Sequence, residues 1–380
     1  MPKYRFSEIA TNVTDKRMPV PEDKDLYIAP NNLDTDTLSV PEYGYKVDLN
    51  GTKLIMHKGD MLFGRREPQL KKAAIAPHDG LFSAHGMIFH PREEVITKEF
   101  FPFFISSDYF FDAAIRISVG SLSPTVNWKD LKDLEFDIPD LSAQQEYAKV
   151  LWAMIRAKKA YKELIKKTDD LVKSQFIEMF GDPVDNPMGW DTKPLLMMGS
   201  CKNGMNFHSN DSGVEINCLG VGDFKGFDVI ANTHDLPMVS LNEMPSEEYL
   251  LKDGDIVFVR SNGNKTMVGR SVMVFPNDNP TVFSGFCIRY RHDDDSVIAS
   301  YLLRVLKTES VRKQMYGRGA NIQNLNQKTL AAINIPVPPM ELQKEYVAFV
   351  EQSDKSKFAA QQALKEVADA QKALMKKIFE

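Results

Sequence analysis

Cysteine is scarce in this sequence, with three residues among 380 and no CxxC pair. Cysteines so few and so scattered exclude a disulfide framework and a cysteine-based zinc site. No run approaches the about 18 consecutive apolar residues of a membrane-spanning helix. The first residues also lack the apolar segment of a signal peptide. These absences predict a cytoplasmic protein that makes no contact with a membrane.

The short motifs of the common catalytic classes are missing too. There is no Walker A loop, no HExxH zinc motif, no Gly-x-Ser-x-Gly elbow and no Asn/Asp-Pro-Pro-Tyr/Phe tetrapeptide of amino-methyltransferases. His78, His85 and His90 lie close together in the sequence, but their spacing fits no standard zinc motif. We therefore expect no catalytic residue and no metal site, with an enzyme of unrecognised motifs as the alternative.

Composition is that of a globular protein, with 43% apolar and 26% charged residues. A chain of 380 residues is long enough for two or three domains. The formal net charge is −5, which taken alone argues against a nucleic-acid binder, because such a surface should be basic. The distribution of the charge along the chain therefore matters more than its sum.

The chain repeats itself at a distance of about 195–201 residues. Several segments recur in the same order in both halves: Lys58–Arg65 with Asp253–Arg260, Leu81–Gly86 with Val282–Cys287, and Gln144–Ala148 with Gln343–Val347. An ordered series of matches is an unlikely product of chance. The sequence therefore predicts two copies of a globular half followed by a helix.

The helix after each half is predicted to be long. Between Ser142 and about Phe180 there is no Gly or Pro, and apolar residues follow a three-four spacing that only Lys158 interrupts. The second helix, from about Glu341 onward, has a weaker stripe. Such helices are unstable alone, so we expect them to pair as an antiparallel coiled coil. The predicted seam and partner interface consists of Leu151, Ile155, Tyr161, Ile165, Val172, Met179, Val350, Leu364, Val367, Leu374 and Ile378.

The globular halves are predicted to mix strands and helices. Short β-branched or aromatic runs bounded by turn residues, such as Lys53–Met56 and Asp255–Arg260, predict strands. Lys98–Ile117 and Ser296–Tyr316 predict one helical stretch in each half. The expected fold is α+β in four parts: globular domain 1–141, helical spacer 142–182, globular domain 183–339 and helical spacer 340–380.

Basic residues cluster after the equivalent strand of both halves, although each half is mildly acidic overall. Residues 1–141 carry 17 basic and 22 acidic side chains, and residues 181–339 carry 15 and 18. Arg and Asn can bond to guanine and adenine edges, and Gly permits close backbone approach, so these loops are interpreted as DNA-contacting. An ordinary solvated turn is the alternative. The candidates are Arg65, Arg66, Lys71, Lys72, Arg260, Asn262, Gly263, Asn264, Lys265, Arg270 and Arg318.

The order and duplication of these motifs resembles the specificity subunit of type I restriction–modification systems, over essentially the whole chain. Asp140 departs from the family pattern, in which a second proline is usual. The matching segments are the boundary motifs Ile138–Gln145 and Ile335–Gln343, the helix exit Phe176–Pro183 with Gly189 and Trp190, and the internal signatures Gly254–Gly263 and Gly317–Asn326.

The resemblance implies two target recognition domains, each reading one half of a bipartite, asymmetric site in double-stranded DNA, with the coiled coil as a ruler. It implies partners as well, namely two modification subunits that methylate adenine and two restriction (translocase) subunits. S-adenosylmethionine, Mg²⁺ and ATP are then expected on those partners and no cofactor in this chain. The alternatives are a self-contained methyltransferase or nuclease and an acidic DNA mimic that blocks restriction enzymes.

Overall fold

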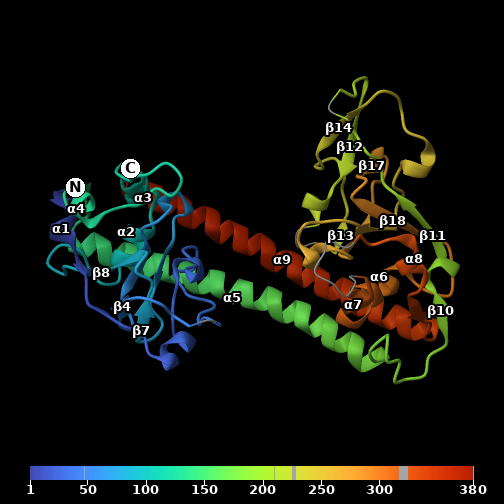
Figure 1. Ribbon diagram of the computed structural model, residues 1–380, viewed down its shortest axis with the longest axis horizontal. Coiled ribbons are helices and arrows are strands. Elements are labelled where there is room, and N and C mark those ends of the chain that lie inside the picture. Colours follow the sequence, from blue (N-terminus) through green and yellow to red (C-terminus); the bar gives the residue numbers. More distant parts are fainter. Residues whose placement is uncertain (47, 209, 225–227, 316–323, 380) are drawn as a thin grey trace. The chain divides into compact units, whose positions relative to one another are not determined.

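The structure, a computed structural model, describes residues 1–46, 48–208, 210–224, 228–315 and 324–379. Its contacts divide the chain into two compact units, residues 1–166 with 358–380 (unit 1) and residues 167–357 (unit 2). Two helices of 40 residues each contribute to both units, α5 (Leu141–Phe180) and α9 (Met340–Phe379). Each unit therefore consists of one globular domain, one end of α5 and the opposite end of α9 (Figure 1).

The first domain, residues 1–140, consists of short elements. In chain order they are β1 (Lys3–Arg5), α1 (Phe6–Ile9), β2 (Ala10–Val13), β3 (Lys16–Arg17), η1 (Pro21–Asp25), η2 (Pro30–Asn32), β4 (Lys53–Met56), β5 (Met61–Gly64), η3 (Pro68–Leu70), β6 (Ala73–Ile75), β7 (Gly80–Phe82), β8 (Gly86–Pro91), α2 (Phe101–Ser106), α3 (Asp108–Arg116), α4 (Trp128–Leu131) and β9 (Glu135–Asp137).

The larger sheet of unit 1 is buried on both faces. Its strand order is β2-β8-β5-β6, and the smaller sheet has the order β3-β4-β7. Along β5, Met61 and Phe63 pack into an aromatic core with α2, α3, α5 and α9, whereas Leu62 packs against the smaller sheet. Successive residues of a strand face opposite sides, so a strand covered on both sides must be apolar throughout. This explains why β5 is an uninterrupted apolar run.

The second domain repeats this arrangement. Its elements are β10 (Thr192–Pro194), η4 (Leu195–Met197), β11 (Gly199–Asn203), β12 (Val214–Leu219), η5 (Val221–Asp223), β13 (Val229–Ile230), β14 (Met238–Leu241), η6 (Glu247–Tyr249), β15 (Asp255–Val259), η7 (Lys265–Met267), β16 (Ser271–Val274), β17 (Thr281–Phe283), β18 (Cys287–His292), α6 (Ala299–Lys307), α7 (Glu309–Met315), α8 (Gln327–Ala331) and β19 (Asn334–Pro336).

Strand pairing shows the duplication directly. The larger sheet of unit 2 has the order β11-β18-β15-β16-β13, and its central strand β15 lies between β16 and β18 as β5 lies between β6 and β8. The alternation of core contacts is also repeated, because Ile256 and Phe258 pack with the helices and Val257 and Val259 pack on the opposite face. In each domain the first strand pairs antiparallel with the last, β1 with β9 and β10 with β19. The predicted α+β fold with two tandem domains is confirmed.

One prediction about the helices within the domains is wrong. Each expected single helix is two, α2 and α3 in the first domain and α6 and α7 in the second. The break lies at Ser107 and at Thr308, whose backbones are extended, with ψ of 151° and 147°. The Ser107 hydroxyl accepts a hydrogen bond from the Phe110 amide and so caps α3. A serine or threonine inside an apolar stretch is thus a helix start in both repeats.

A buried glutamine attaches the start of each long helix to its own domain. The Gln144 side chain accepts a hydrogen bond from the Thr97 amide at 2.7 Å and donates to the carbonyls of Val95 at 2.9 Å and Pro139 at 2.8 Å. Gln343 does the same with the Ile298 amide at 2.9 Å and the carbonyls of Ser296 and Pro338. We call these residues the glutamine clamps.

Within each unit the segments of α5 and α9 run antiparallel. In unit 1 the beginning of α5 shares a core with the end of α9, where Leu151 and Ile155 pack with Ile378. In unit 2 the end of α5 packs with the beginning of α9, where the Tyr346 hydroxyl donates to the Val172 carbonyl at 3.1 Å. Of the predicted seam residues, Leu151, Ile155, Val172, Val350 and Ile378 are buried, and Tyr161, Ile165, Met179, Leu364, Val367 and Leu374 are half-buried.

Among the residues that the structure describes, none of the helices combines the length and the apolar character needed to cross a membrane.

Candidate nucleic-acid interface

The basic loop of the first domain follows β5 and is held by backbone contacts. The Arg65 carbonyl accepts a hydrogen bond from the Val126 amide at 2.9 Å, and Arg66 forms a β-bridge with Thr125. Further along, Glu67 and Lys71 have positive φ angles of 53° and 48° and flank the short helix η3. The loop is therefore a tight turn with a defined conformation.

The four basic side chains of this loop have different surroundings. Arg66 is exposed, and Arg65 is half-buried. The Lys71 ammonium lies 2.5 Å from Asp108 and 3.4 Å from Asp112, both on α3, and Lys72 donates to the Leu33 carbonyl at 3.3 Å. Burial alone would lower the pKa of Lys71, but the hydrogen bond and charge of Asp108 raise it. Lys71 and Lys72 therefore support the loop, and the two arginines are the stronger candidates for DNA contact.

His85 indicates that this part of the first domain has a positive potential. Burial lowers the pKa of His85, and the charges of Arg66, Arg65 and Lys53 lower it further. Lys53 and His85 are distant from this loop in the sequence, and the pairing of the strands brings them close to it. A histidine that is neutral at neutral pH can donate or accept one hydrogen bond at such a site.

The three histidines near this loop do not converge. His90 lies 2.7 Å from the Asp60 carboxylate, and Nδ1 of His78 lies 2.9 Å from the carbonyl of Asp79. In the ranges that the structure describes, no group of three His, Cys, Asp or Glu residues is arranged to hold a metal ion.

The basic loop of the second domain connects β15 to β16 and is braced at both ends. The Arg260 carbonyl accepts from the Leu325 amide at 2.8 Å. From α7, the Arg312 guanidinium donates to the carbonyls of Thr266 at 2.9 Å and Val268 at 3.2 Å. Gly269 has a φ of +75°, and a Cβ there would lie 2.9 Å from Met315, so only glycine fits. The sequence alone does not show that Arg312 braces this loop.

The tip of this loop is exposed and shaped by its own asparagines. The Asn262 side chain accepts from the Asn264 amide at 2.8 Å, and the Asn264 side chain caps η7 by accepting from the Thr266 amide at 3.0 Å. Gly263, Asn264 and Lys265 are exposed, and a Cβ on Gly263 would meet open space. Within the part of the chain that the structure describes, the NH₂ group of each amide thus remains available as a donor while its oxygen is used locally.

The remaining candidates of the second domain lie elsewhere. Half-buried Arg260 donates to the Gly285 carbonyl at 3.2 Å. Arg270 lines a pocket of about 780 Å³ together with Arg304 and Lys307, which bind Asp228. Burial alone would raise the pKa of Asp228, but the charges of Lys307 and Arg304 lower it to about 2. Arg318, with most of the signature Gly317–Asn326, lies outside the described residues.

A further basic group, not predicted, lies on neighbouring strands of unit 2. Lys202 of β11 is opposite Arg289 of β18 in the sheet register. Lys202 pairs with Glu248 at 2.7 Å and Arg291 pairs with Asp255 at 2.7 Å. Arg289 is buried, and its Nε and Nη1 have no hydrogen-bond partner among the described residues. The sequence signal that could have predicted this group is the spacing of Arg289 and Arg291, because alternate residues of a strand share a face.

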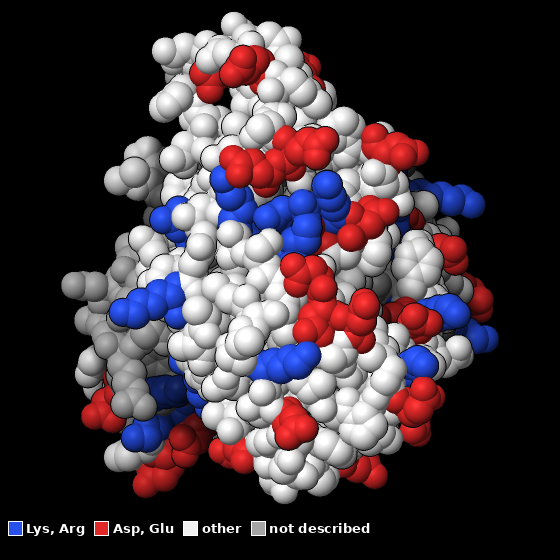
Figure 2. All heavy atoms as spheres, turned by 90° about the vertical axis from the view of Figure 1, so that its right-hand side faces the viewer, with Lys and Arg blue, Asp and Glu red and all other residues white. Residues whose placement is uncertain are grey.

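Basic and acidic side chains are interspersed on the surface shown in Figure 2. There the Lys and Arg side chains gather into a short band that is bordered by Asp and Glu. On this face the basic side chains thus form a local group rather than a continuous basic surface, in line with the near balance of charge in each half.

Both repeats match one family model, described as the type I restriction modification DNA specificity domain, over residues 27–167 and 223–369. The chain is 24% identical over 282 residues to the type I restriction enzyme StySPI specificity subunit of Salmonella potsdam, covering 68% of this chain and 59% of that one. It is 23% identical over 298 residues to the EcoKI specificity subunit of Escherichia coli, covering 73% and 62%. The matches thus span about three fifths of these relatives.

Solved structures show the same fold over the full chain. The type I restriction–modification S subunit from M. genitalium aligns over 100% of this chain and 96% of its own, with a TM-score of 0.60 and 14% identity. A chain from a structural study of type I R-M complex assembly aligns over 100% and 97%, with a TM-score of 0.56 and 19% identity. With both repeats matched by the model and the fold shared from end to end, the chain belongs to the type I restriction modification DNA specificity domain family.

Proposed function

We propose that this chain is the DNA-recognition subunit of a type I restriction–modification complex and has no catalytic residues of its own. Each globular domain reads one half of a bipartite, asymmetric site in double-stranded DNA, and α5 and α9 set the distance between the halves. S-adenosylmethionine, Mg²⁺ and ATP are expected on the partner subunits.

The observation that carries this proposal is the basic loop after the equivalent central strand of both domains. Arg65 and Arg66 follow β5, and Arg260 with Asn262 follows β15. Each loop is braced by its own domain, so its side chains are preorganised and less entropy is lost on binding. Loops positioned by a rigid scaffold are the usual carriers of binding residues.

The two alternatives from other classes are less well supported. The relatives that the chain matches are specificity subunits of type I restriction enzymes, which favours a recognition role over a self-contained enzyme. A DNA mimic would spread carboxylates along its surface, whereas here basic side chains recur at the same position of both repeats.

Docking of two modification subunits on the helices is part of the proposal. Besides the paired seam, α5 carries exposed apolar side chains at positions separated by multiples of seven residues, namely Val150 (46%), Leu164 (47%) and Leu171 (52%). Residues seven apart lie on one side of a helix. An apolar stripe left exposed on a long helix is a surface for a partner protein. Two restriction subunits are then expected to join the assembly for cleavage.

Selection from a random DNA library with the full chain and the modification subunits of its own host tests the proposal. We expect the bound duplexes to contain two defined half-sites separated by a gap of constant length. Enrichment of one continuous sequence, or of none, would refute the proposal. Binding of S-adenosylmethionine to the isolated chain, measured by calorimetry, separates the enzyme alternative, because we expect none.

A further inference from the structure

Two lysines, Lys158 and Lys357, are the charged residues in the seam positions of the long helices, which otherwise carry apolar residues and glutamines. At seven-residue spacing, α5 presents Gln144, Leu151, Lys158, Ile165, Val172 and Met179, and α9 presents Gln343, Val350, Lys357, Leu364, Gln371 and Ile378. The glutamine clamps and the lysines stand at matching places in both series. A lysine retained in both copies of an apolar seam suggests a specific role.

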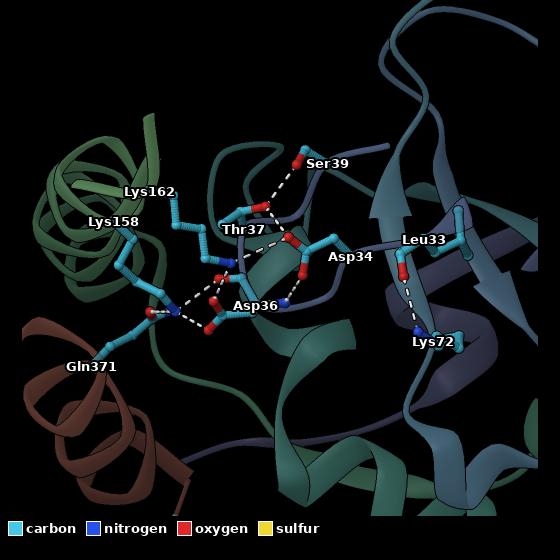
Figure 3. Close-up of polar contacts among 9 residues, drawn as sticks. All are labelled: Leu33, Asp34, Asp36, Thr37, Ser39, Lys72, Lys158, Lys162 and Gln371. Atoms are coloured by element: carbon cyan, nitrogen blue, oxygen red, sulfur yellow. Dashed lines mark hydrogen bonds and ion pairs between the residues drawn. The ribbon is translucent and has the colours of Figure 1, made fainter. Parts of the chain in front are cut away.

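Lys158 is almost completely buried in unit 1, with 3% of its side chain exposed. Its ammonium group donates to the Asp36 carbonyl at 2.8 Å and to Oε1 of Gln371 at 3.0 Å, and it pairs with the Asp36 carboxylate. Figure 3 shows these contacts, with Lys158 from α5 and Gln371 from α9 both directed at the loop that carries Asp36. One ammonium group thus joins both helices and the first domain.

The loop of residues 33–39 connects this site with the basic loop after β5. Thr35 donates to the Lys71 carbonyl at 2.5 Å and accepts from the Ala73 amide at 2.9 Å, while Lys72 binds the Leu33 carbonyl. Within the loop, Thr37 bonds to Asp34 and Ser39 at 2.6 Å each, and Lys162 pairs with Asp36 at 2.8 Å (Figure 3). A continuous series of polar contacts therefore leads from the helix pair to the candidate DNA-contacting segment.

A buried charge of this kind does not serve stability. Removing an ammonium group from water costs several kcal/mol, and apolar replacement of a buried ion pair is often neutral or stabilising. A polar residue at one seam position does, however, specify the register of paired helices, because any other register leaves it buried without a partner. In unit 2, Lys357 fills the matching position and pairs with Asp169 of α5 at 2.6 Å.

We propose that Lys158, bound to Gln371 and Asp36, fixes the register of α5 against α9 in unit 1 and holds the first domain at one position on the helix pair. The glutamine clamps attach each helix start to its own domain. The end of α9 also packs on the first domain, where Phe379 lies against Phe100 and Tyr109, and Lys158 adds the polar contact that distinguishes this register from others. Lys158 is a positioning residue, and its consequence for DNA rests on the proposed function.

The test measures the distance between two spin labels in the full chain, at exposed Glu93 of the first domain and exposed Lys372 of α9, introduced as non-canonical amino acids. We expect one narrow distribution for the unsubstituted chain. Lys158→Met should add a second population, displaced by about 10 Å for a slip of one heptad. A single unchanged distribution in Lys158→Met would overturn the proposal.

Two further variants complete the experiment. Lys159→Met changes the exposed neighbour of Lys158 and should leave the distribution narrow; broadening there would also count against the proposal. Gln371→Leu removes the partner on α9 and keeps the pair of Lys158 with Asp36, so it decides the matter if Lys158→Met does not fold. It should again produce the second population.

Selection from the DNA library then links the register to recognition. Lys158→Met should keep both half-sites and accept an additional gap that differs by about three base pairs, because 10 Å corresponds to about three steps of the duplex. Failure of the unsubstituted chain to select any bipartite site would refute the proposed function and leave the distance measurement standing. Selection of the same single gap by Lys158→Met would refute the positioning role.

Discussion

The two domains share a scaffold but differ in how their basic loops are used. In the first domain, Lys71 and Lys72 are bound to α3 and to the loop of residues 33–39, and Arg66 remains exposed. In the second domain, the exposed tip carries Asn264 and Lys265, and the brace is Arg312 from α7. The two repeats therefore share the position of the loop and differ in its exposed side chains, which fits the proposal that the domains read different half-sites.

The largest effect is expected from changing the length of both helices, which are common to the two domains. Removing one heptad from the middle of α5 and one from α9 shortens the pair by about 10 Å, or about three base pairs. The selected DNA should keep both half-sites and lose about three base pairs between them. If the same library selection gave an unchanged gap and altered half-sites, the proposal that the helices set the distance between the half-sites would be wrong.

The glutamine clamps test whether the two repeats are energetically equivalent. Gln144→Ala and Gln343→Ala each leave three buried or half-buried backbone groups without their side-chain partner, so each should cost about 3 kcal/mol of stability. Hydrogen exchange should show the loss of stability in unit 1 for Gln144→Ala and in unit 2 for Gln343→Ala. Gln145→Ala, at an exposed position beside the clamp, is the control and should be neutral. A large effect of one clamp alone would show that the repeats are not equivalent.

The basic loops can be separated by single substitutions. Arg66→Ala should weaken binding by about 1–3 kcal/mol and relax only the half-site of the first domain, and Arg260→Ala should do so only for the second. Binding titrations with duplexes altered in one half-site measure this. A loss that is uniform over all sequences would identify a phosphate contact instead.

Lys71→Met is the matched control for those arginines, since its ammonium is bound to Asp108 and Asp112. DNA affinity should change by less than about 0.5 kcal/mol, as for substitutions away from an interface. A loss of DNA affinity as large as that of Arg66→Ala would show that Lys71 contacts DNA.

The smallest effect is expected from acid. The pKa of Asp228 is about 2 in the folded protein and near 4 when unfolded. Its contribution to unit 2 is therefore fully present above about pH 4 and is lost as the pH falls towards 2. Asp228→Asn should lower the stability of unit 2 by about 1–2 kcal/mol at neutral pH and flatten its pH dependence in that window. Denaturation followed at several pH values checks this, with unit 1 as the internal reference.

Much of the fold could be predicted because its signals are local. Apolar runs between turns predict the strands Lys53–Met56 and Asp255–Val259. A stretch of 40 residues without Gly or Pro predicts α5. The split of the domain helices was missed because Ser107 is read as a helix residue unless its capping bond to Phe110 is known. For the candidate site, the sequence located the basic loops but did not show which of their side chains are bound within the protein. The partners of Lys71, for example, are 37 and 41 residues away in sequence.

The sequence by itself determined the duplication, the α+β class, the two long helices and the position of the basic loops, because periodicity and repetition are properties of the chain. Only the tertiary structure decided which basic side chains face outward and which are bound within the protein. Lys158 illustrates the difference, since in sequence it interrupts an apolar stripe and in the structure it meets Asp36 and Gln371 from distant segments. The energy of a buried charge depends on the groups around it, and folding brings those groups together.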